Sequence, residues 1–85
     1  MRILNRSSHS VVYELRGGPL RMTLSTCELA PGEEETWRAR YRGEIVTTTL
    51  LIEFGDEVLR AEFGADAVVE VVDDGASVKV QEVSG

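Results

Sequence analysis

The chain has 85 residues, of which 42% are hydrophobic and 28% charged, and its formal net charge is −6. This is the composition of a folded chain, and the length predicts a single domain, residues 1–85, with one modest core. An acidic surface repels phosphate backbones, so we do not expect nucleic acid as a partner. No apolar run approaches the ~20 residues of a membrane helix, so we expect no membrane segment either.

Cysteine usage bears on the cellular compartment. Cys27 is the only cysteine, so no intramolecular disulfide can form, which favours a reducing compartment. The amino-terminal segment MRILNRSSHS lacks the apolar stretch of a signal peptide. The sequence therefore predicts a cytoplasmic protein.

Apolar and polar residues alternate along the chain with a period of two, and no segment shows the 3.6-residue spacing of an amphipathic helix. Turn sequences such as RGGP at 16–19 and Gly55-Asp56 separate the alternating segments. Pro31-Gly32 suits the central positions of a type II turn. The predicted strands are, in chain order, residues 2–5, 11–16, 20–25, 35–41, 44–54, 57–63, 67–72 and 77–83.

The segment AVVEVV at 67–72 departs from alternation, because its valines would cover both faces of one strand. Strands buried on both sides read this way, which indicates a second sheet layer or a subunit contact. The fold class expected is all-β: a small antiparallel β-sandwich or closed barrel of about seven to eight strands with a C-terminal meander. An open sheet whose edge pairs with another copy is the alternative. The stretch ELAPGEEETW at 28–37 resembles Ig-like and other sandwich modules, in which a Pro-Gly turn leads into a strand.

Two turns set a register for the middle of the chain, if Arg42-Gly43 and Gly55-Asp56 are each two-residue turns. Trp37 then lies opposite Thr48, and Thr48 lies opposite Phe63. Both turns sort the residues onto the same face, which a one-residue slip would destroy. The result is a predicted three-stranded meander that pairs Leu50 with Ala61 and Ile52 with Leu59, and whose inward face holds Trp37, Ala39, Tyr41, Val46, Leu50, Ile52, Phe54, Leu59, Ala61 and Phe63.

The opposite face of this meander carries two arginines from the strand ETWRARY, Arg38 and Arg40. One interpretation is a solvated face on which these arginines pair with Glu53 and Glu62. The other is a contact surface, because interface cores are enriched in arginine and a wet face rarely carries several large apolar residues. The candidate contact residues are Arg38, Arg40, Ile45, Leu51, Val58, Arg60 and Glu62, together with Val68 and Val72 of the doubly apolar strand.

The sequence gives little support for a catalytic site or a metal site. His9 is the only histidine and lies far from Cys27 in sequence, whereas a zinc site needs four such ligands. A pair made of His9 with Cys27 or a nearby serine would be the only nucleophilic candidate, and a surface histidine and a structural cysteine are the simpler interpretations. We therefore predict no catalytic residue, no metal and no cofactor.

Charge is unevenly divided along the chain. Residues 1–42 carry seven arginines against five glutamates, and residues 43–85 carry Arg60 and Lys79 against ten acids. Oppositely charged halves favour pairing within the chain or between copies. The expected function is a non-enzymatic protein-interaction or self-assembling β module, with a homo-oligomer or another protein as partner. The alternative is a small ligand-binding domain that holds a sugar or other polar ligand against Trp37, Tyr41 and the neighbouring arginines.

Overall fold

The computed structural model describes residues 1–18, 20–38, 47–74 and 77–83. Within these residues the regular elements are all strands, as the period-two pattern predicts. In chain order they are β1 (Arg2–Asn5), β2 (Val11–Gly17), β3 (Met22–Leu29), β4 (Glu34–Thr36), β5 (Thr47–Phe54), β6 (Glu57–Gly64), β7 (Val68–Asp74) and β8 (Ser77–Glu82).

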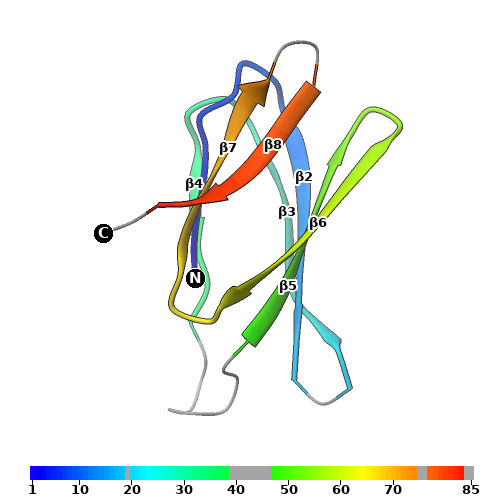
Figure 1. The fold of residues 1–85 in the computed structure, drawn as a ribbon, viewed down its shortest axis with the longest axis vertical. Helices are drawn as coiled ribbons and strands as arrows, with labels where there is room; N and C mark the ends of the chain where they lie inside the picture. The colour runs from blue at the N-terminus through cyan, green and yellow to red at the C-terminus, as the bar shows by residue number, and fades with distance from the viewer. Residues whose placement is uncertain (19, 39–46, 75–76, 84–85) are drawn as a thin grey trace.

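The strands form two sheets that pack as an open sandwich (Figure 1). Sheet A has the order β4-β1-β7-β8, and sheet B has the order β3-β2-β5-β6. Neither sheet closes on itself, so of the two expected architectures the sandwich is confirmed and the barrel is not formed. Every described pairing is antiparallel except that of β1 with β7, which is parallel and places Arg2 beside Val68.

The core lies between the two sheets. Val69 and Val71 of β7 are fully buried there, so a second layer does account for one face of the AVVEVV strand, as expected. Val68 and Val72 lie on the other side of β7 and are half-buried. The buried apolar residues are Met1, Ile3, Val11, Tyr13, Leu15, Leu29, Leu50, Ile52, Val69, Val71 and Val78.

The hairpin of β5 and β6 has the predicted register. Thr48 pairs with Phe63, and the pairs Leu50–Ala61 and Ile52–Leu59 also form. Gly55 has a φ of 59°, which fits the first central position of a type II′ turn. The Pro31-Gly32 turn is also confirmed: Gly32 has a φ of 86°, and the Glu33 amide donates to the Ala30 carbonyl at 3.0 Å.

The first strand of the predicted meander belongs to the other sheet. β4 pairs with β1 at the edge of sheet A, with Thr36 opposite Arg2, and the Trp37 amide donates to the Met1 carbonyl at 2.8 Å. The expected pairing of Trp37 with Thr48 is therefore wrong, because alternation fixes a strand's faces and not its neighbour. Residues 39–46, with the assumed Arg42-Gly43 turn, lie outside the described residues.

Candidate functional site: the outer face of sheet B

The outer face of sheet B is defined by the alternation of its strands. Leu50 and Ile52 are buried between the sheets, so Thr49, Leu51 and Glu53 project from the opposite side of β5. Pairing with β2 and β6 sets their neighbours in rows. Written β2–β5–β6, the rows are Arg16–Thr49–Glu62, Glu14–Leu51–Arg60 and Val12–Glu53–Val58, and we call these nine residues the outer patch.

A depression of about 160 Å³ lies on this face, and three of its five lining residues are arginines. Ligand pockets usually measure ~300–1,000 Å³, so this one suits a single side chain or a small polar group. Leu51 contributes apolar surface, so the site combines an apolar contact with several guanidinium donors. The lining residues are Arg16, Arg21, Thr49, Leu51 and Arg60.

Local backbone features bring Arg21 to the depression. The hairpin between β2 and β3 has Gly18 at a φ of 82° and Arg21 at a φ of 49°, and the Arg21 amide donates to the Gly18 carbonyl at 3.1 Å. The left-handed region disfavours a residue with a Cβ by roughly 1–2 kcal/mol. A register shift beside Leu15 and Arg16 places Leu24 as an extra residue in β3, a bulge of the kind that redirects side chains at sheet edges.

The charges of the outer patch are only partly paired within the chain. Arg16 Nε donates to a Glu14 carboxylate oxygen at 3.0 Å, and Thr23 Oγ1 donates to the other at 3.0 Å. The hydrogen bond from Arg16 is the main reason that the pKa of Glu14 is lowered. Among the described residues, Arg21 and Arg60 have no carboxylate within 4.0 Å. Positive charge around the depression is therefore available to an outside group.

The outer face of sheet A differs in this respect. Arg2 pairs with Glu34 at 2.7 Å, and Arg6 pairs with Glu70 at 2.8 Å. Gln81 also donates to Glu70 at 2.6 Å. These charged groups thus already have partners within the chain, whereas Lys79, which lies opposite Val72, has no carboxylate within 4.0 Å among the described residues.

The structure separates the predicted contact residues into groups. Leu51, Val58, Arg60 and Glu62 lie together in the outer patch. Val68 and Val72 lie on the outer face of sheet A, so the two sets cannot form one surface.

Arg38 follows β4 and is close enough to the Met1 ammonium to lower its pKa, so it does not belong with Arg60 as expected. Arg40 and Ile45 lie outside the described residues. Sequence reasoning missed Val12, Glu14, Arg16 and Arg21. The first three could have been placed from the sequence, because they alternate along β2 with buried residues such as Tyr13.

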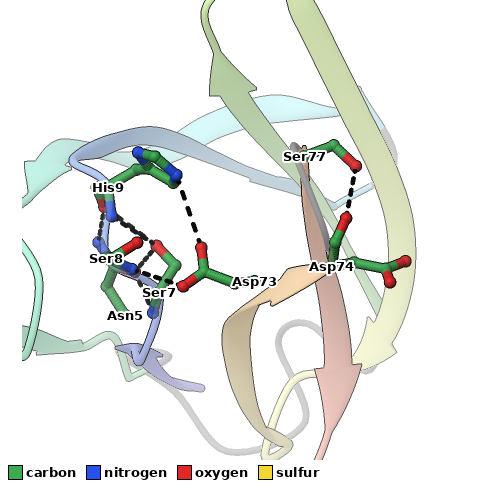
Figure 2. A network of polar contacts seen from close by, with 7 residues as sticks. All are labelled: Asn5, Ser7, Ser8, His9, Asp73, Asp74 and Ser77. Atoms are coloured by element: carbon green, nitrogen blue, oxygen red, sulfur yellow. Dashed lines mark hydrogen bonds and ion pairs between the residues drawn. The ribbon is translucent and has the colours of Figure 1, made fainter.

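The loop after β1 brings Ser7 and His9 close to Asp73 of β7, which raises the question of catalysis (Figure 2). Ser7 Oγ lies 2.6 Å from Asn5 Oδ1, and His9 Nε2 lies 3.7 Å from Asp73 Oδ1. Among the described contacts, Ser7 Oγ bonds Asn5 and the His9 backbone, not the His9 ring. The ring instead packs on Phe54 at a centroid distance of 4.7 Å. These contacts anchor a loop and do not form the hydrogen bond between nucleophile and base that catalysis needs.

The described residues also bear on metal binding and on membrane insertion. In that part of the chain no group of three or more His, Cys, Asp or Glu side chains is placed to hold a metal ion. The same residues contain no helix of the length and apolarity that crossing a membrane requires. The chain matches no protein-family model, no curated protein and no solved structure.

Proposed function

We propose that this chain is a non-enzymatic interaction module that binds another protein chain through the outer patch. The observation that carries the proposal is the coexistence of exposed apolar and unpaired charged groups on that face. Val58 is 60% exposed, and Leu51 and Val12 of the same face are half-buried. Interface cores combine apolar side chains with arginine in this way.

The chemistry of the face indicates the chemistry of the partner. Burying apolar surface contributes roughly 25 cal/mol per Å², so Val58 and Leu51 favour an apolar counterpart. Arg16, Arg21 and Arg60 favour carboxylates, which guanidinium groups bind with two parallel hydrogen bonds. The partner surface is therefore apolar at its centre and carries acidic side chains around it.

Site-specific photo-crosslinking tests this proposal. A benzophenone amino acid replaces Val58, and in a matched variant it replaces Lys79, which is exposed on sheet A. After irradiation, both in the source cell and in a concentrated solution of the purified chain, we expect a discrete protein adduct from position 58 in at least one of the two samples and none from position 79 in either. The mass of the adduct identifies the partner. Equal yields from both positions, or no adduct from position 58, would overturn the proposal.

A second candidate function rests on the arginine-lined depression, whose volume suits one small carboxylate-bearing ligand. The expected platform of Trp37 and Tyr41 gains no support, because Trp37 packs against the core and Tyr41 lies outside the described residues. Acetate titration followed by arginine side-chain NMR distinguishes this function. Saturable shifts that are lost in Arg60→Gln support it, and shifts that rise linearly with acetate exclude it.

A further inference from the structure

The outer patch has an arrangement of charge that is complementary to itself. In its first row, Arg16 on β2 and Glu62 on β6 flank Thr49. In the second row the signs are reversed: Glu14 on β2 and Arg60 on β6 flank Leu51. Each side of β5 thus presents one positive and one negative side chain, in opposite order.

A two-fold axis that runs along β5, parallel to the sheet, exchanges these two sides. A second copy placed by this axis sets its β6 over β2 of the first copy, and its β2 over β6. Arg16 then faces Glu62 of the second copy, and Arg60 faces Glu14 of the second copy. Symmetry repeats both contacts, which gives four pairs of opposite charge in one isologous interface.

The apolar residues of the patch follow the same symmetry. Leu51 meets Leu51 of the second copy at the axis, over the depression that this residue helps to line. In the third row, Val12 faces Val58 of the second copy. Like charges oppose association at two places: the two Glu53 side chains meet on the axis, and the arginines that line the depression of each copy lie near the axis at Leu51.

We propose that the partner of the outer patch is a second copy of this chain, packed face to face about a two-fold axis along β5. The inference rests on the proposed function, because it names the occupant of the same surface. It goes beyond that function by specifying the symmetry and the contacts. The partner chemistry deduced above, an apolar centre with carboxylates around it, is that of the patch itself.

The size of the face sets the expected strength. The axis along β5 overlays three strands of each copy, and three strands ~4.8 Å apart and about seven residues long, at ~3.3 Å per residue, project to roughly 330 Å². A standard interface buries about 800 Å² on each partner, so this dimer belongs to the weak, reversible class. We therefore expect dimers only at high protein concentration, with a dissociation constant on the order of 0.1–1 mM.

Sedimentation equilibrium up to about 1 mM tests the dimer with three single substitutions. Glu53→Gln removes the like-charge contact between the two Glu53 side chains and tightens the dimer. Arg60→Glu turns two attractive contacts into repulsive ones and weakens it by about tenfold or more. Lys79→Glu makes the same change of charge on sheet A and leaves the dimer unchanged. A wild-type chain that stays monomeric, or equal effects of Arg60→Glu and Lys79→Glu, would overturn the proposed dimer.

A charge-swap pair tests the symmetry directly. One variant carries Glu14→Arg and Glu62→Arg, and the other carries Arg16→Glu and Arg60→Glu. Each variant repels itself in the proposed arrangement, whereas a mixture of the two restores all four attractive contacts. Circular dichroism first confirms that both variants fold.

We expect two monomers that form a heterodimer when mixed. A mixture that stays monomeric overturns the two-fold arrangement. An adduct of a different mass at position 58 would then retain the proposed function while rejecting the second copy as partner. The absence of any adduct at position 58 would reject both.

Discussion

The side-chain amide of Asn5 donates a hydrogen bond to the Leu29 carbonyl at 2.9 Å, which joins the end of β1 in sheet A to the end of β3 in sheet B. The same amide donates to the His9 carbonyl at 2.7 Å. Asn5 Oδ1 accepts from the Ser7 amide at 3.0 Å and from Ser7 Oγ at 2.6 Å. All four hydrogen-bonding positions of this 1%-exposed side chain are thus filled.

Replacing Asn5 tests how much this network contributes. Asn5→Leu keeps the side-chain size but leaves two carbonyls and the Ser7 amide without these partners. Each buried polar group left unpaired costs about 1–3 kcal/mol, so we expect the free energy of unfolding to fall by at least ~3 kcal/mol. Urea denaturation followed by circular dichroism measures it. Ser10→Ala, at an exposed position of the same loop, serves as control, and a similar small loss for both variants would contradict the prediction.

Adjacent leucines on β5 separate the core from the outer patch. Leu50 is 1% exposed, whereas Leu51 is half-buried and faces outward. We expect Leu50→Ala to lower the free energy of unfolding of the monomer by about 2–5 kcal/mol and Leu51→Ala by well under half as much. Leu51→Ala should instead weaken association. Dilute thermal unfolding and concentrated sedimentation measure the two effects, and a reversed order of stabilities would contradict the assignment of faces.

The hairpin of β5 and β6 shows what local sequence is sufficient to predict. Gly55-Asp56 sets a two-residue turn, and the alternation of the flanking strands then sets the pairs Leu50–Ala61 and Ile52–Leu59. The same parity correctly places Leu51, Val58, Arg60 and Glu62 on one face. These features depend on residues close together in the chain.

Long-range pairing is not encoded in such patterns. The parallel contact of Arg2 with Val68 joins residues far apart in sequence, and no turn marks it. The alternation of β4 is compatible with a place in either sheet. Because β4 was assumed to pair with β5, Arg38 was assigned to the wrong surface. Arg21 was missed because it reaches the site from a hairpin in which its own backbone has an unusual φ of 49°. An arginine in the sequence does not indicate such a backbone conformation.

The amino-terminal ammonium group of Met1 should make the free energy of unfolding depend on pH. Met1 N donates to the Trp37 carbonyl at 2.6 Å and to the Ala65 carbonyl at 2.7 Å. Its pKa is lowered below 8.0, mainly by desolvation, while Asp66 raises it and Arg38 lowers it. The unfolded chain therefore binds more protons in the window just below pH 8, so the free energy of unfolding should rise with pH there.

Titration of ¹⁵N-labelled Met1 by NMR measures this pKa. We expect Asp66→Asn to lower it further and Arg38→Gln to raise it, because each substitution removes one of the two opposing charge effects. Urea denaturation across the same pH window should show the matching change in stability. Shifts of the same sign in both variants would mean that the ammonium group is not placed between these two side chains.

The backbone of Arg21 gives a final prediction, because its φ of 49° suits glycine better than any residue with a Cβ. Arg21→Gly should raise the free energy of unfolding by about 0.5–1 kcal/mol, the part of the strain that remains after glycine's greater freedom in the unfolded chain is counted. Arg21→Ala removes the same charge but keeps the Cβ, so it should leave stability nearly unchanged. If glycine and alanine have equal effects in thermal unfolding, the charge and not the backbone governs this position. If glycine stabilises the fold while it weakens binding at the depression, arginine is present there for its guanidinium group and at the expense of stability.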